Sequence, residues 1–227
     1  MLELNRLYCM DCMEGMKQFP DGYFDLAITD PPYGLGMEQG ANIYAGKIFD
    51  KKDWDKSPPP PEYFKELFRV SKNQIIFGGN YFDLPPSRCF IVWDKGEGFY
   101  GRTFAECELA WTSFDANTVK VKRDPLARRD YMGKIHPTQK PVALYAWIIN
   151  FLFEKGLLHK GAKVIDTHVG SGSSLIALDR AGLQYIGFEI DRDYCDAAGE
   201  RITTELSQLS FIEQMGGGTS LCEQLSL

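Results

Sequence analysis

The chain has 227 residues, of which 44% are hydrophobic and 25% are charged, a composition typical of a globular protein with one domain. Its net charge of −6 argues against a protein that simply coats nucleic acid, because phosphate binding depends on clustered Lys and Arg. No apolar run reaches the roughly 20 residues that span a bilayer, and no signal-peptide pattern opens the chain, so we expect a cytoplasmic protein without a membrane partner.

Short apolar runs rich in β-branched and aromatic residues predict strands that are buried on both faces. In chain order these runs are Arg6–Cys9, Phe24–Thr29, Gln74–Phe77, Cys89–Trp93, Glu108–Thr112, Lys163–Asp166 and Tyr185–Glu189. Helical patterns separate most of them. They follow Ser57, extend from Pro141 to about Lys155, cover Ser173–Arg180 and start again near Arg192.

Alternating strands and helices predict an α/β fold with a mostly parallel sheet and helices on both faces. The strands around Val92 and Ala110 are the exception, because their short, glycine-containing connection suits an antiparallel hairpin. We predict a single domain over residues 1–214, with a catalytic-side loop at 35–60 and a basic recognition loop at 114–138. The glycine-rich residues 215–227 are expected to form a flexible C-terminal tail.

The segment from Val164 to Glu189 has the layout of a site for an adenosine-containing cofactor. A strand ends in Asp166, the turn Gly170–Gly172 leads into a helix, and the next strand ends in Glu189. Glycines let a backbone approach a ligand, and the second acid can accept hydrogen bonds from ribose hydroxyls. Leu175 stands where a dinucleotide fingerprint needs its third glycine, and Asp166 would repel a pyrophosphate. A nicotinamide-dependent oxidoreductase is therefore disfavoured.

The sequence Asp30-Pro31-Pro32-Tyr33 directly follows the predicted strand Phe24–Thr29. Such a turn commonly just ends a strand, but it also fits chemistry at an amino group on a purine or pyrimidine. That nitrogen is a poor nucleophile, because its lone pair is delocalised into the ring. The Asp30 carboxylate and the Pro31 carbonyl can accept its two N–H bonds, while Tyr33 offers a face on which the base can stack.

Three motifs resemble those of the β group of DNA amino-methyltransferases, which modify N6 of adenine or N4 of cytosine. Asp30–Tyr33 resembles their motif IV, His136–Pro141 their motif X, and Asp166–Gly172 their motif I. This order is typical of the β group, and the resemblance spans roughly residues 6 to 201. One departure is Thr167–Val169, where most members have Pro-Phe followed by a variable residue.

The resemblance implies the methyltransferase fold, with seven strands and the antiparallel hairpin at the sheet edge, and S-adenosylmethionine as cofactor. It implies cofactor contacts from Asp11, Asp30, Thr138, Gln139, Lys140, Asp166, Gly170, Ser171, Gly172 and Glu189. It also implies double-stranded DNA as partner and a bacterial or phage origin, and it allows a homodimer and a cognate restriction endonuclease. No metal is expected, because Cys9 and Cys12 form a C-x-x-C pair without a second pair at ligand spacing.

Residues 120–140 carry seven basic and two acidic side chains, a local excess of positive charge. Such a run alone more often marks a solvated loop, but the β group inserts its target-recognition segment near this place. We therefore predict phosphate contacts from Arg123, Arg128 and Arg129. In the loop beside the catalytic tetrapeptide, Lys47, Lys52 and Trp54 are predicted to contact nucleic acid as well.

The predicted reaction is direct in-line methyl transfer from S-adenosylmethionine to the N6 amino group of an adenine flipped out of DNA. Asp rather than Ser before Pro-Pro-Tyr favours adenine, and N4-cytosine methylation is the alternative. A non-catalytic DNA-binding protein with the same fold is a more distant one, which the intact Asp30, Tyr33 and Gly170–Gly172 argue against. His168 is interpreted as a packing residue, because this transfer needs no strong base.

Overall fold

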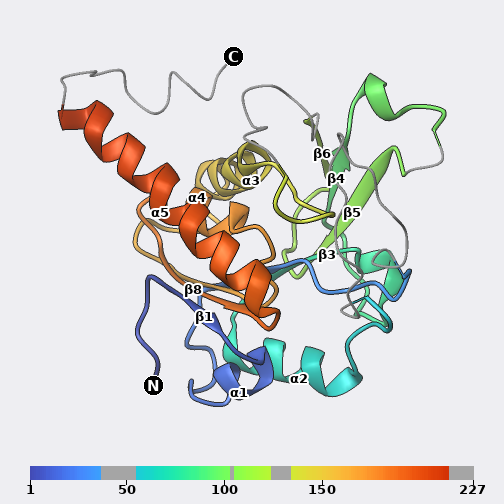
Figure 1. Ribbon diagram of the computed structural model, residues 1–227. Coiled ribbons are helices and arrows are strands. Elements are labelled where there is room, and N and C mark those ends of the chain that lie inside the picture. The colour runs from blue at the N-terminus through green and yellow to red at the C-terminus, as the bar shows by residue number, and fades with distance from the viewer. Residues whose placement is uncertain (37–54, 103–104, 124–133, 215–227) are drawn as a thin grey trace.

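The structure is a computed structural model, and it describes residues 1–36, 55–102, 105–123 and 134–214, with side chains described as far as residue 208. In this part of the chain one eight-stranded sheet has the order β1-β8-β7-β2-β3-β5-β4-β6 (Figure 1). The strands are β1 (Arg6–Cys9), β2 (Leu26–Thr29), β3 (Gln74–Phe77), β4 (Phe90–Asp94), β5 (Cys107–Thr112), β6 (Val119–Lys122), β7 (Lys163–Asp166) and β8 (Gln184–Glu189).

The helices are α1 (Cys12–Met16), α2 (Pro61–Val70), α3 (Val142–Glu154), α4 (Ser173–Arg180) and α5 (Arg192–Gln214), with 3-10 turns η1 (Gly79–Tyr81) and η2 (Glu97–Phe99). All seven predicted strands and all four predicted helices are confirmed. The short helix α1 was not predicted, since five residues are too few to show a helical period. Gly156, with a φ of 66°, follows α3 in the left-handed conformation that commonly ends a helix.

Helices cover both faces of the sheet, as Figure 1 shows. On one face, α1 and α2 pack against the sheet through Met16, Tyr63, Leu67 and Val70, which belong to a cluster with Phe188 of β8. A larger cluster on the other face joins α3, α4 and α5 to the sheet. The central strands β2 and β3 are buried along their whole length, which explains their continuous apolar sequences.

The hairpin is confirmed, because β4 pairs antiparallel with β5, but its predicted position at the sheet edge is wrong. An eighth strand, β6, pairs in parallel with the outer side of β4. It lies inside the segment 114–138 that was predicted to be a loop. Its sequence Val-Lys-Val-Lys alternates, so that Val121 is 4% exposed and joins the core while both lysines face outward. The two lysines make the segment as highly charged as a surface loop, so the alternating pattern of a strand was not recognised in the sequence.

Parallel pairing of β2, β7 and β8 determines where the site forms. The carboxyl ends of parallel strands meet at one edge of a sheet, which is where α/β proteins bind ligands. Asp30 follows β2, Asp166 ends β7 and Glu189 ends β8. None of the helices in the described ranges combines the length and the apolar composition that a membrane span needs.

Candidate active site

A cavity of about 820 Å³ is lined by residues that follow β2, β7 and β8. Asp30, Pro31, Pro32 and Tyr33 form one part of its wall, and Gly170, Ser171 and Glu189 form another. The tetrapeptide Asp30–Tyr33 and the glycine turn, about 140 residues apart, therefore share one cavity. Its volume lies in the range of about 300–1,000 Å³ that is common for small-molecule sites.

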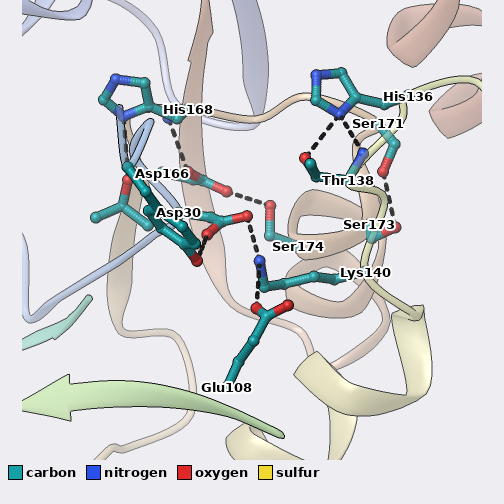
Figure 2. A network of polar contacts seen from close by, with 12 residues as sticks. Asp30, Glu108, His136, Thr138, Lys140, Asp166, His168, Ser171, Ser173 and Ser174 are labelled. Atoms are coloured by element: carbon teal, nitrogen blue, oxygen red, sulfur yellow. Dashed lines mark hydrogen bonds and ion pairs between the residues drawn. The ribbon is translucent and has the colours of Figure 1, made fainter. Parts of the chain in front are cut away.

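Asp30 lies within a network of charged side chains, of which Lys140 is buried and Asp30, Glu108 and Lys95 are half-buried (Figure 2). The Lys140 ammonium donates to Asp30 Oδ2 and lies 3.2 Å from Glu108 Oε2. Lys95 completes the row, with its Nζ 2.8 Å from Glu108 Oε1. The Lys140 side chain is 4% exposed, and its Nζ lies 4.7 Å from the centre of the Phe77 ring. Charges with so little access to water need partners of opposite sign, and here the charges alternate in sign.

The network determines the protonation of its members. Burial disfavours the Lys140 ammonium, but the carboxylates of Asp30 and Glu108 outweigh it and raise the pKa of Lys140 above its usual value. Burial also raises the pKa of Asp30, an effect that Lys140 opposes and Glu108 reinforces. At Glu108 burial again raises the pKa, but Lys140 and Lys95 together lower it overall.

The Tyr33 ring is held between the turn that follows β2 and the 3-10 turn η1. Its hydroxyl donates to Asp30 Oδ1 at 2.5 Å, and its ring stacks on Tyr81 with centroids 4.9 Å apart and planes 17° apart. A Cβ on Gly78 would lie 2.2 Å from the Tyr33 ring, so only glycine leaves space for the ring here. Tyr81 covers part of the stacking surface that the sequence assigned to a base.

The glycine turn is tied to the end of β8. The Gly170 N–H donates to Glu189 Oε2 at 2.9 Å, and the Asp191 N–H donates to Glu189 Oε1 at 2.9 Å. A carboxylate has about four acceptor positions, so two remain for ligand hydroxyls. Gly170 and Gly172 have φ values of 54° and 81°, and Ile202 lies 3.0 Å from where a Gly172 Cβ would be. These features fit the ribose of an adenosine-containing cofactor.

Asp166 lies behind the cavity rather than in its wall. Its Oδ1 accepts the His168 N–H at 3.0 Å and its Oδ2 accepts the Ser174 hydroxyl, so the carboxylate organises the glycine turn. Burial raises the pKa of Asp166 to about 7, despite these two donors. The geometry does not favour the direct cofactor contact that the family resemblance implied for Asp166. Asp11 caps α1 by accepting the Met13 N–H, and it does not line the cavity either.

The segment before α3 brings Thr138, Gln139 and Lys140 to the cavity wall. Thr138 hydrogen-bonds His136 Nδ1 through both its N–H and its hydroxyl, at 3.3 and 3.1 Å. The Gln139 side chain accepts the Ile135 N–H at 3.0 Å. Burial, followed by the charge of Lys140, lowers the pKa of His136 to about 3, so its ring is neutral and can accept these bonds.

His168 lines the cavity, but its ring contacts are structural. Its Nδ1 lies 3.1 Å from Thr167 Oγ1, and its ring packs edge-on against Tyr63 at 5.3 Å. Burial lowers its pKa to about 4, which keeps the ring neutral near pH 7. These contacts favour the packing role over a general base.

Only one of the predicted nucleic-acid contacts lies in the described residues. Arg123 follows β6, and its carbonyl accepts the Trp93 indole N–H at 2.8 Å. The other predicted residues, Lys47, Lys52, Trp54, Arg128 and Arg129, lie outside the described residues. Within the described ranges, no three His, Cys, Asp or Glu side chains are grouped as a metal site.

Several cavity residues were missed by the sequence analysis. The hairpin β4–β5 contributes Trp93, Lys95 and Glu108, and a buried Lys134 lies nearby. Burial and the neighbouring Lys95 lower the pKa of Lys134 to about 8. One signal was available, since Glu108 is an acid at the start of the otherwise apolar run of β5.

A family model for N6/N4 methyltransferases, described as DNA methylase, matches residues 88–200. The putative methylase YubD of Escherichia coli K12 is 29% identical over 220 residues, which cover 88% of this chain and 90% of that protein. The crystal structure of the M1.HpyAVI–SAM complex matches with a TM-score of 0.54 and 21% identity, covering 86% of this chain and 98% of that one. The cytosine-N4-specific PvuII DNA methyltransferase matches with a TM-score of 0.53 and 16% identity, covering 89% and 91%.

Proposed function

On the match of residues 88–200 to the DNA methylase family, we propose that the chain is a DNA methyltransferase that transfers the methyl group of S-adenosylmethionine to the N6 amino group of adenine in DNA. One observation carries the proposal. The turn that begins at Asp30 lines the same cavity as Gly170 and Glu189, which hydrogen-bond each other. The cavity is large enough for a cofactor and a flipped base together.

The cofactor supplies a methyl group on a positively charged sulfur, and the protein positions the attacking nitrogen. Asp30 has acceptor positions left on both oxygens, because Tyr33 and Lys140 each use only one. With the Pro31 carbonyl it can accept both amino hydrogens of the base and direct the nitrogen lone pair. Orientation of this kind is worth roughly 7–11 kcal/mol in well-aligned reactions.

At the other part of the cavity, Glu189 has two acceptor positions for ribose hydroxyls, and Gly170 allows close approach of the backbone. Thr138, Gln139 and Ser171 supply further polar groups in the wall. We assign these residues to cofactor binding. Asp166 contributes by holding the turn through His168 and Ser174.

Adenine is favoured by Asp30, since many cytosine-N4 enzymes of the family have Ser at this position. The test is to incubate the protein with S-adenosylmethionine and DNA, digest the DNA and identify the methylated nucleoside by mass spectrometry. N6-methyladenine is expected, and N4-methylcytosine would replace the adenine assignment with the alternative. A wild-type protein that leaves both bases unmodified would contradict the proposed activity. Asp30→Asn, which keeps the side-chain shape, is the inactive control.

DNA binding is assigned to Arg123, which follows β6, and to Arg128 and Arg129, which come later in the basic segment of the sequence. Changing Arg123, Arg128 and Arg129 together to Ala is expected to weaken DNA binding and flatten its salt dependence while leaving cofactor affinity intact. A triple variant with wild-type DNA affinity at every salt concentration would refute this assignment. The homodimer and the cognate restriction endonuclease stay predictions.

A further inference from the structure

Lys140 joins three parts of the chain that are remote in sequence. It stands just before α3, Asp30 follows β2 and Glu108 lies on β5. The Lys140 ammonium contacts a carboxylate oxygen of each acid, and Lys95 holds the second oxygen of Glu108. Figure 2 shows Lys140 between Asp30 and Glu108.

Resting on the proposed function, we propose that Lys140 is a positioning residue that keeps the Asp30 carboxylate ionised and aimed at the target amino group, and that Glu108 anchors Lys140. The family resemblance implied that Lys140 contacts the cofactor, whereas in the structure its ammonium pairs with the carboxylates of Asp30 and Glu108. Asp30 must be ionised to accept a hydrogen bond from the amino group of the base, because a protonated carboxyl would present an O–H donor to a group that is itself a donor.

The surroundings of Asp30 explain why it needs this cation. Several charged or titratable groups face Asp30 and act on its charge. They are the Tyr33 hydroxyl on the same turn, Lys140 before α3, Glu108 on β5, Tyr145 on α3 and Asp166 on β7. Lys140 is the cation in this set, and burial opposes the ionised form of Asp30. Removing Lys140 therefore leaves a half-buried carboxyl beside two other acids, which raises the pKa of Asp30.

The two neighbours of Asp30 predict opposite effects. Lys140→Met removes the positive charge with little change of shape, so Asp30 becomes harder to ionise. Glu108→Gln removes a negative charge and leaves Lys140 in place, so Asp30 becomes easier to ionise. A role in packing alone would not move the two variants in opposite directions.

The experiment follows the carboxyl carbon of Asp30 by NMR titration in the free protein, and the rate of a single methyl-transfer turnover against pH at saturating cofactor. Lys140→Met is expected to move the Asp30 titration and the acid limb of the rate to higher pH by about one unit. Its rate at pH 7.5 should fall at least about tenfold, while cofactor affinity stays within about twofold. Glu108→Gln should move both titrations to lower pH.

Lys72→Met is the matched control, because Lys72 lies at the opposite end of the strands, where it pairs with Asp25 and is 59% exposed. It should leave both profiles unchanged. The inference would be overturned if Asp30 titrated at the same pH in the wild type, Lys140→Met and Glu108→Gln. It would also be overturned if the main defect of Lys140→Met were a loss of cofactor affinity. If Lys140→Met does not fold, Glu108→Gln alone decides by the direction of its shift. Opposite titration shifts in a protein that methylates no DNA would support the electrostatic role and contradict the proposed function.

Discussion

Gly78 controls the position of the Tyr33 ring, and Gly78→Ala should therefore slow methyl transfer sharply. The new Cβ would lie 2.2 Å from one ring carbon of Tyr33 and 2.5 Å from another. Ordinary contact begins at about 3.4 Å, so the ring must move by roughly 1.2 Å. It cannot do so freely, because it stacks on Tyr81 and its hydroxyl bonds Asp30 at 2.5 Å.

A displacement of about 1 Å at a reacting group can cost on the order of 100-fold in rate, equivalent to about 2.7 kcal/mol of barrier. Gly78 also has a φ of 67°, and a residue with a side chain pays roughly 1–2 kcal/mol of stability there. The loss of rate and the loss of stability must be separated by a control.

Gly161→Ala is that control, since Gly161 has a φ of 73° but no atom within 4 Å of the position of a Cβ. Both variants should lose stability in urea unfolding, and only Gly78→Ala should lose the rate of a single turnover at saturating cofactor. If Gly78→Ala transfers methyl groups within about threefold of Gly161→Ala, the ring does not need its observed position and the reasoning is wrong.

Two further predictions concern the cofactor turn and the stability of the fold. Arg201 donates to the Ser171 carbonyl at 3.0 Å and to Ser173 Oγ at 2.9 Å, so Arg201→Met should weaken cofactor binding about tenfold by calorimetry. The exposed Arg192 on the same helix is the control, and equal affinities in both variants would contradict the assignment. Burial lowers the pKa of His168 to about 4 in the folded protein, whereas an unfolded histidine has a pKa of about 6.5. Between these two pH values the unfolded state binds a proton that the folded state does not bind. The free energy of unfolding therefore falls as the pH falls from about 6.5 to about 4. Between pH 7 and 5 the wild type should lose up to about 2 kcal/mol more unfolding free energy than His168→Gln, and parallel pH slopes in urea titrations would disprove this.

The sequence alone determined most of the strands and the strand ends at which the motif residues lie. Continuous apolar runs predicted β2 and β3, and the strand pattern predicted that Asp166 and Glu189 end strands of a mostly parallel sheet. Because parallel strands place their carboxyl ends together, Asp30 and Glu189 line one cavity. These inferences succeed because the apolar pattern of a strand and the acidic residue at its end both lie within a few consecutive residues. The strand β6 escaped, since its pairing with β4 is a non-local property and its lysines look like those of a loop.

Only the tertiary structure decided which charges meet. Nothing near Lys140 in the sequence indicates that its ammonium contacts Asp30, 110 residues away, or that Glu108 lies on its other side. Likewise, Asp166 has the expected place at a strand end, but packing turns its carboxylate toward Ser174 and away from the cavity. The physical reason is burial. The strength of a charge pair and the protonation of its members depend on how much water is excluded, and that is determined by the whole fold rather than by neighbouring residues.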